Sequence, residues 1–315
     1  QAPPMRERAI IEQLLSPLAT HESAGGLCDD AARYRVPPGH ELIVTTDMLQ
    51  AGVHFLDTGP PEAIAAKALG ANLSDLAAMA ATPYAYQLAL ALPHTLGEAW
   101  LRRFCSGLRA YSGRYGIALS GGDLIRSSGP LSLSITAHGT ALAGQALPRS
   151  AACPGDGLWI SGTLGDATLG LDLLREAAAA PVTETDRQAM VGRYWYPEPR
   201  LALTQALRGT ARAGIDISDG LLADCRTMMK ASGVGAQLQA STLPTSAAMR
   251  AYCAAAPEAA LKCMLSGDDY EVLLALPPRF SAAAAVTIAG VALTRIGSVV
   301  ADPDVDLVLD PGELA

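Results

Sequence analysis

The stretch Glu41-Leu42-Ile43-Val44-Thr45-Thr46-Asp47-Met48 decides how the first half of the fold is interpreted. Its run of apolar and β-branched residues predicts a buried strand over residues 41–48. The strand is expected to end in two hydroxyl groups and a carboxylate, at the edge of a sheet where open α/β proteins place their ligands. Thr45, Thr46 and Asp47 are therefore candidate metal ligands.

Five further islands of aspartate interrupt the otherwise apolar chain. They are Asp29-Asp30, Asn72-Leu73-Ser74-Asp75, Gly121-Gly122-Asp123, Asp216-Ile217-Ser218-Asp219-Gly220 and Gly267-Asp268-Asp269-Tyr270-Glu271. A carboxylate is costly to bury unless it is paired or binds a cation. Hard cations such as Mg²⁺ take oxygen ligands and commonly bind together with substrate phosphates. The islands therefore predict an enzyme that assembles a polyphosphate–metal site from segments far apart in the sequence.

Each island taken alone also has a structural interpretation. Asp29-Asp30 follows two glycines and could form a solvated turn. Asp75, in a helix expected over residues 62–81, could pair with Lys67, although about two helical turns separate them. Ser218 or Asp219 could cap the helix expected over residues 220–231, or the same helix N-terminus could bind a phosphate.

Alternating strands and helices predict an α/β or α+β fold with two domains, residues 1–148 and 149–315. In the first half, strands are expected at 87–92, at 117–121 (ending at Gly121-Gly122-Asp123) and at 131–142. In the second half, strands at 157–162, 214–217, 235–240, 270–276 and 293–299 alternate with helices at 166–178, 199–208 and 220–231. Paired glycines at the end of a strand let the backbone approach a phosphate closely.

Composition excludes several classes of protein. Thirty-one acidic against 23 basic residues give a net charge of −8, and without a basic run neither nucleic acid nor an anionic membrane is an expected partner. No apolar run is long enough to span a membrane. Six cysteines without a CxxC pair indicate free thiols in a reducing cytoplasm. The three lysines all lack a preceding glycine, which excludes a P-loop kinase.

In their order, the islands resemble the thiamine-monophosphate kinase family, which belongs to the superfamily of aminoimidazole ribonucleotide synthetase. The similarity extends from about residue 26 to about residue 300. The stretches that carry it are Val44 to Met48, Gly52-Val53-His54-Phe55, Lys67 to Met79, Gly121-Gly122-Asp123, Ser161 to Asp166, Ile215 to Asp224 and Ser266 to Glu271.

The resemblance implies an enzyme that phosphorylates thiamine monophosphate to thiamine diphosphate with ATP and several Mg²⁺ ions. It implies direct in-line transfer, with no nucleophile on the protein, because the acceptor phosphate supplies its own oxygen. It also implies two synthetase-like domains and a homodimer in which the N-terminal sheet pairs with its copy. The implied metal ligands are Asp30, Thr45, Thr46, Asp47, Asp75, Asp123, Asp216 and Asp219. The implied ATP contacts are Gly122, Asp123, Arg149 and Ser218, and His54 and Asp268 are expected at the thiamine phosphate.

Two other interpretations remain open from the sequence. One is another ATP-dependent synthetase of the same superfamily, of the purine-biosynthetic or selenophosphate type. The other is a divalent-cation-binding protein without turnover. The chain also departs from the family pattern, with Leu124-Ile125 after Gly-Gly-Asp and Cys105 where relatives can place a tyrosine on the adenine. As an isolated histidine, His54 is more often structural than catalytic.

Overall fold

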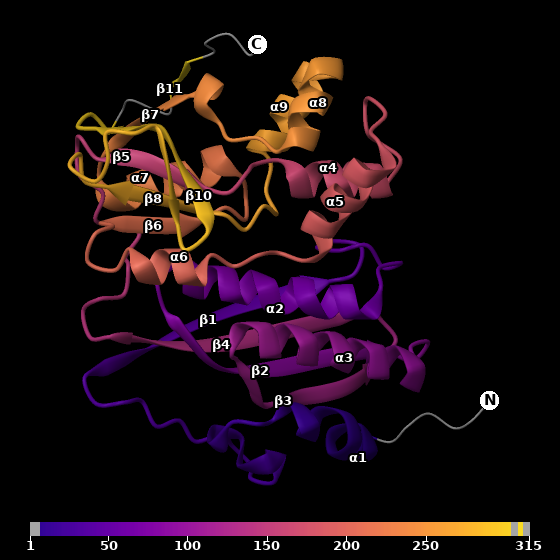
Figure 1. Cartoon of the computed structure of the whole chain (residues 1–315). Helices are drawn as coiled ribbons and strands as arrows, with labels where there is room; N and C mark the ends of the chain where they lie inside the picture. The colour runs from indigo at the N-terminus through magenta and orange to yellow at the C-terminus, as the bar shows by residue number, and fades with distance from the viewer. Residues whose placement is uncertain (1–6, 304–307, 311–315) are drawn as a thin grey trace. The chain divides into compact units, whose positions relative to one another are not determined.

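The computed structural model describes residues 7–303 and 308–310. They form two compact units (Figure 1). The N-terminal unit takes in the described residues up to Leu76 together with Ala81–Gly144, and the C-terminal unit takes in Ala77–Ala80 and the described residues from Gln145 onward. The fold class predicted from the sequence, α/β with two synthetase-like domains, is confirmed.

The N-terminal unit is a four-stranded sheet with two helices on one face (Figure 1). Its strand order is β1-β4-β2-β3, with β2 and β3 parallel and the other neighbours antiparallel. Short helical turns at Glu7–Ile10 (α1), Ile11–Leu15, Ser16–Leu18 and Glu22–Leu27 precede the sheet. The main elements are β1 (His40–Gln50), α2 (Pro61–Ala78), β2 (Thr82–Pro93), α3 (Glu98–Tyr115), β3 (Ala118–Ser127) and β4 (Ser132–Leu142).

Helix α2 lies in the core because small and apolar residues surround it on nearly all sides. Ala63, Leu69 and Leu73 are fully buried, as is typical of a helix that is apolar all round. Helix α3 packs against its first turn, where a Cβ at Gly107 would lie 2.6 Å from the Cα of Glu62. This close approach fixes α2, which carries Asn72 and Asp75, against the sheet.

The C-terminal unit is built on a seven-stranded sheet of order β11-β7-β10-β5-β8-β6, with β9 paired to β10. Its strands are β5 (Gly157–Ser161), β6 (Ala213–Asp216), β7 (Gly235–Gln239), β8 (Val272–Leu276), β9 (Ala285–Ile288), β10 (Val291–Val300) and β11 (Val308–Asp310). Its helices are α4 (Asp166–Leu174), α5 (Glu184–Trp195), α6 (Leu201–Ala206), α7 (Leu221–Ser232), a short turn at Ala240–Thr242, α8 (Ala247–Ala255) and α9 (Pro257–Leu265).

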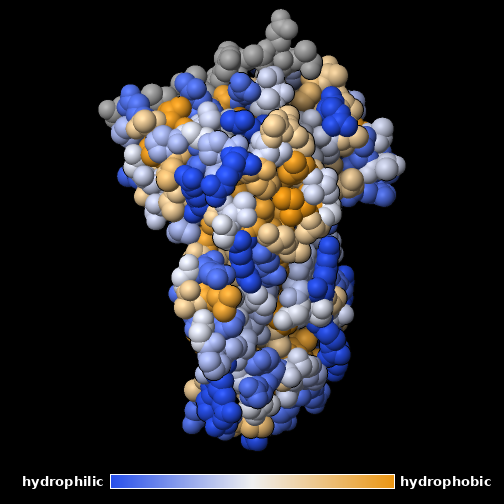
Figure 2. All heavy atoms as spheres, turned by 60° about the vertical axis from the view of Figure 1, so that its left-hand side comes forward, coloured by the Kyte–Doolittle hydropathy of each residue, from blue (hydrophilic) through white to orange (hydrophobic). Residues whose placement is uncertain are grey.

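Two apolar clusters fill the two faces of this sheet. The larger packs residues of α4, α7, α8 and α9 against the strands. The smaller packs Trp159 and Leu274 of the sheet against Leu203 and Leu207, at and just after α6. Figure 2 shows apolar side chains gathered in one area of the surface of this unit, between polar regions. No helix in the described ranges has both the length and the apolar character needed to cross a bilayer.

Several predicted boundaries were wrong, and hydrogen bonding between strands explains the two that matter for the site. Strand β1 continues past Asp47 to Gln50 because β4 pairs with it along its whole length. Strand β3 continues past Asp123 to Ser127 because β2 pairs with it in parallel. Both aspartates therefore lie within strands and not at their ends. The helix predicted over 166–178 stops at Leu174, and α3, α5, α8 and α9 were not predicted at all.

Candidate functional site

On the helix-covered face of the N-terminal sheet, polar side chains of β1 and α2 meet. The Thr45 hydroxyl donates a hydrogen bond to the Asp75 carboxylate. The side-chain oxygen of Asn72 accepts from the Asp47 backbone N–H at 3.2 Å, and its amide donates to the Ala68 carbonyl at 3.1 Å. Burial, together with the nearby charge of Asp75, raises the pKa of Asp47 to about 6. Two carboxylates that repel each other in a half-buried position have the chemistry of a cation site.

The opposite, open face of the same sheet forms one wall of a pocket of about 550 Å³. The N-terminal segment supplies Asp29 and Asp30 to this pocket, and β3 supplies Gly121, Gly122 and Asp123. Gly122 has a φ of +148°, and a Cβ there would lie 1.8 Å from the Leu88 carbonyl oxygen, so no other residue fits. Asp29 forms an exposed ion pair with Arg33, which favours its interpretation as a turn residue.

The pleat of the sheet separates the predicted metal ligands of this unit into two groups. Asp47 pairs with Ile135, which is fully buried on the helix side. Asp123 pairs with Ala89, which pairs with Ser134, and all three line the pocket on the open side. Directly paired residues point to the same face, so Asp47 and Asp123 lie on opposite faces.

The same geometry places each remaining candidate ligand of this unit on one of the two faces of the sheet. Thr45 and Asp75 lie with Asp47, whereas Asp30 lines the pocket with Asp123. Thr46 is on the open face, where its hydroxyl lies 2.9 Å from that of Thr136, another residue of the pocket wall. Among the residues that the structure describes, no three or more His, Cys, Asp or Glu side chains are arranged to hold a metal. The separation of the carboxylates onto two faces of the sheet is one reason.

In the C-terminal unit, the loops 216–220 and 266–271 are joined by backbone hydrogen bonds. The N–H of Ile217 donates to the Glu271 carbonyl at 2.8 Å, and the N–H of Asp268 donates to the Ser218 carbonyl at 3.0 Å. A Cβ at Gly267 would lie 2.1 Å from that same Ser218 carbonyl oxygen. The two loops therefore form one rigid body that holds Asp216, Ser218, Asp219 and Asp268 together.

Neither Ser218 nor Asp219 caps helix α7, so that structural interpretation was wrong. The N-cap residue is Gly220, which has no side chain. Asp224 of the first helical turn instead accepts hydrogen bonds from the backbone N–H groups of Ser218, Asp219 and Gly220, at 3.1, 3.0 and 3.0 Å. Asp224 is buried, which raises its pKa to about 6 although the three donors act in the opposite direction.

A buried ion-pair network supports the second loop, and no pattern in the sequence predicts it. Glu271 is fully buried and accepts two hydrogen bonds from Arg200, at 2.6 and 2.5 Å, and one from Arg193 at 2.8 Å. The Ser161 hydroxyl donates to the same carboxylate at 2.5 Å and accepts from the Val272 N–H at 2.9 Å. The arginines lie 71 and 78 residues before Glu271, too far for any local pattern to reveal the contact.

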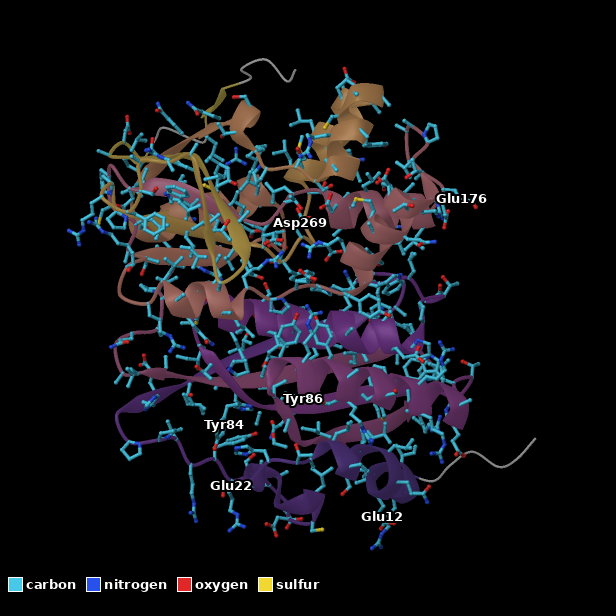
Figure 3. All side chains as sticks on the ribbon, in the orientation of Figure 1. Glu12, Glu22, Tyr84, Tyr86, Glu176 and Asp269 are labelled. Carbon is cyan, nitrogen blue, oxygen red and sulfur yellow. The ribbon has the colours of Figure 1, made fainter. Side chains whose placement is uncertain are left out.

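Asp269 lies in the interior of the C-terminal unit (Figure 3). Both of its carboxylate oxygens accept from the Gly165 backbone N–H, at 3.1 and 2.9 Å. Burial raises its pKa well above the ordinary value. Its neighbours Asp268 and Tyr270 both adopt positive φ, +69° and +51°, and the Tyr270 hydroxyl donates to the Asp268 carboxylate at 3.2 Å. Positive φ at non-glycine residues persists only where surrounding contacts enforce it.

The remaining two candidates lie at the surface. The His54 ring nitrogen accepts from the Gln50 backbone N–H at 3.1 Å and so closes the turn after β1. The Arg149 side chain is exposed, and its carbonyl accepts from the Ser232 hydroxyl at 3.2 Å. The hydrogen bond to the Gln50 N–H gives His54 a structural role. The expected contact between His54 and the thiamine phosphate stays a prediction.

Two family models match the chain, one in each half. The N-terminal domain model of the AIR synthase related proteins matches residues 28–141, and their C-terminal domain model matches residues 153–310. The hydrogenase maturation protein HypE in complex with ATP, 18% identical with a TM-score of 0.73, shares the fold. These matches define the class of protein.

Individual relatives show which members of this class the chain is similar to in sequence and structure. Thiamine-monophosphate kinase of Caulobacter vibrioides is 41% identical over 95% of this chain and 85% of that protein, and the Salmonella typhimurium enzyme is 42% identical over 88% and 84%. The solved structure of thiamine-monophosphate kinase from Stenotrophomonas maltophilia has a TM-score of 0.79 at 39% identity, covering 92% of this chain and 91% of that one. The structure of AaThiL complexed with AMPPCP and TMP has a TM-score of 0.78 at 29% identity, covering 98% and 96%. The chain belongs to the AIR synthase related family and, within it, to the thiamine-monophosphate kinases.

Proposed function

We propose that this protein phosphorylates thiamine monophosphate with ATP, giving thiamine diphosphate and ADP, and that Mg²⁺ ions are required. The observation that carries the proposal is the similarity to thiamine-monophosphate kinases along nearly the whole chain. The solved relative complexed with AMPPCP and TMP supports both substrates. The chain's own carboxylates support the metal, because Asp47 and Asp75 repel each other in a half-buried position where a cation would relieve the repulsion.

Each unit is proposed to supply oxygen atoms as metal ligands. In the N-terminal unit they come from both faces of the sheet, and in the C-terminal unit they come from the loop before α7. The proposed set is Asp30, Thr45, Thr46, Asp47, Asp75, Asp123, Asp216 and Asp219. When bound, Mg²⁺ would neutralise the charge of the polyphosphate, which is the main requirement of phosphoryl transfer.

The chain's residues then have positioning roles. We propose that Gly122, Asp123, Arg149 and Ser218 contact ATP and that His54 and Asp268 contact the thiamine phosphate. Gly122 lines the pocket beside Asp123, and its lack of a side chain leaves the backbone open to a ligand there, which supports the ATP contact. The Tyr270 hydroxyl holds the Asp268 carboxylate in one orientation, which supports a recognition role. A direct in-line transfer needs no nucleophile from the protein, because a phosphate oxygen of the acceptor attacks.

The assembly and its location are also proposals. Residues 1–148 and 149–315 are proposed as the two domains. Val44, Met48 and Ile125 are 52, 62 and 53% exposed and share the open face of the N-terminal sheet, which supports a homodimer formed through that face. All six cysteines are free, which supports a reducing compartment, the cytoplasm.

The product assay tests the proposal directly. The protein is incubated with ATP, Mg²⁺ and thiamine monophosphate, and thiamine diphosphate and ADP are separated and quantified. Equal amounts of both products support the kinase. ADP formed without thiamine diphosphate would favour another synthetase of the superfamily, and cation binding without ADP would favour a protein without turnover.

Two variants test the metal ligands. Asp75→Asn and Asp219→Asn are expected to lower the rate strongly at limiting Mg²⁺ and less at saturating Mg²⁺, because each removes a charged ligand. Asp57→Asn, a change at an exposed position outside the proposed site, is the matched control. Wild-type rates for Asp75→Asn and Asp219→Asn at limiting Mg²⁺ would remove these residues from the ligand set.

A further inference from the structure

The N-terminus of helix α7 has an unusual capping arrangement. A helix leaves its first backbone N–H groups without helical partners, and a side chain before the helix usually satisfies one of them. Here the residue at that position is Gly220, with a φ of +118°. Asp224, inside the helix, instead accepts with one oxygen from the N–H of the N-cap residue Gly220 and from the N–H groups of the two loop residues before it, Ser218 and Asp219, at 3.0 to 3.1 Å.

Three consecutive N–H groups that converge on one point form a binding site for an anion. In many nucleotide-binding proteins such a site, at a helix N-terminus, holds a phosphate. In this protein the site is already filled by a carboxylate of the same chain. Asp224 is only 5% exposed, so a phosphate could enter only by displacing a buried and tethered charge.

The opposite side of the same loop is held as well. The Ser218 carbonyl accepts from the Asp268 N–H at 3.0 Å, and the Ile217 carbonyl accepts from the Tyr270 N–H at 2.8 Å. The N–H groups of residues 218–220 thus go to Asp224, and the carbonyl groups of Ile217 and Ser218 go to the loop 266–271. Movement of Asp224 would therefore be transmitted both to Asp219 and to Asp268.

We propose that Asp224 is a positioning residue that closes the three amides of residues 218–220, just before α7, to phosphate and fixes the backbone of Ser218 and Asp219. The Ser218 hydroxyl and the Asp219 carboxylate, and not the backbone amides of this loop, then face the nucleotide and its metal. The assignment of those two side chains rests on the proposed function, whereas the closure of the amides of residues 218–220 rests on the geometry alone.

The closure is tested without any assay of activity. Amide resonances of residues 218–220 are followed in ¹⁵N-labelled protein during titration with inorganic phosphate. In the wild type the three amides are expected to stay unshifted and protected from hydrogen exchange. In Asp224→Ala they should exchange and shift as phosphate binds. Phosphate-induced shifts in the wild type, or unchanged protection in Asp224→Ala, would overturn the closure.

The positioning role is tested by kinetics and chemical rescue. Asp224→Ala is expected to raise KM for ATP by about ten- to a hundredfold, the size typical of a lost charge-assisted hydrogen bond. Added formate should restore part of the loss by entering the vacated position. Asp224→Asn keeps an acceptor oxygen and should lie between the wild type and Asp224→Ala. Asp224→Asn also tests the positioning role if Asp224→Ala does not fold.

Asp186→Ala is the matched control, because Asp186 is likewise a first-turn aspartate, in α5 of the same unit, and should leave KM unchanged. An unchanged KM in Asp224→Ala, or a loss that formate does not reduce, would overturn the positioning role. If the wild type forms no thiamine diphosphate, the proposed function fails and the positioning role with it. The phosphate titration then still decides whether Asp224 keeps phosphate from the amides of residues 218–220.

Discussion

Replacing Asp47 by asparagine is expected to stabilise the metal-free protein while it impairs activity. Asp47 lies in β1 under helix α2, and burial together with the charge of Asp75 raises its pKa from 3.8 to about 6. The folded protein therefore binds a proton at this position more tightly than the unfolded chain does. Above pH 6 the carboxylate is ionised in both states, and its charge then disfavours the folded state.

The size of the effect follows from the shift. A rise of about 2 pKa units corresponds to about 3 kcal/mol of unfolding free energy at about 1.4 kcal/mol per unit. Because the side chain is partly exposed, solvent screening reduces this to about 1–3 kcal/mol. The penalty is absent well below pH 4, where the carboxyl group is protonated in both states; it develops between about pH 4 and pH 6, where only the unfolded chain is ionised, and it is complete above about pH 6.

Urea unfolding in the presence of EDTA, at pH 8 and at pH 4, measures the effect. Asp47→Asn should raise the unfolding free energy by about 1–3 kcal/mol at pH 8 and by no more than about 0.5 kcal/mol at pH 4. Asp57→Asn, at an exposed position, should change neither. A gain of equal size at both pH values, or none at pH 8, would show that repulsion between Asp47 and Asp75 does not limit the stability of the apoprotein.

Three further outcomes follow from the packing and the proposed ligands. Glu271→Gln removes the fully buried carboxylate that Arg193 and Arg200 share and leaves them only the more exposed Glu198 as a charged partner, so it should lower the unfolding free energy by about 3 kcal/mol; a loss below about 1 kcal/mol in urea unfolding would contradict the network's role. Gly107→Ala should lower the unfolding free energy by about 1–3 kcal/mol, because its Cβ meets the α2 backbone. Gly113→Ala lies in the same helix with no atom within 4 Å of its Cβ, and it should be neutral or stabilising. Equal effects of the two changes in thermal unfolding would refute this. Mg²⁺ with ATP at about a hundred times Kd should stabilise the protein by about 2.7 kcal/mol, and an unmoved Tm would count against a nucleotide–metal site.

Much of the fold could be predicted because apolar patterning is local. Residues 131–142 and 157–162 show their strands directly, and both were found within one residue at each end. Helix α3 was missed although a signal was present, since Leu101, Phe104, Cys105, Leu108 and Tyr111 recur at helical spacing and are all buried. The ends of β1 and β3 could not be predicted, because partner strands and not their own residues extend them past the aspartates.

The sequence by itself determined the fold class, the family and the set of aspartates, because a carboxylate in an apolar chain needs a partner or a cation wherever it lies. Tertiary structure alone decided which of these aspartates lie together and which serve the packing of the chain. Strand register places Asp47 and Asp123 on opposite faces of one sheet. Contacts across long stretches of chain made Glu271 the centre of a buried network. Asp224 became the acceptor for the amides of residues 218–220 because the loop before its helix is folded back onto the carboxylate. Such roles depend on which residues meet in space, and no spacing along the chain encodes that.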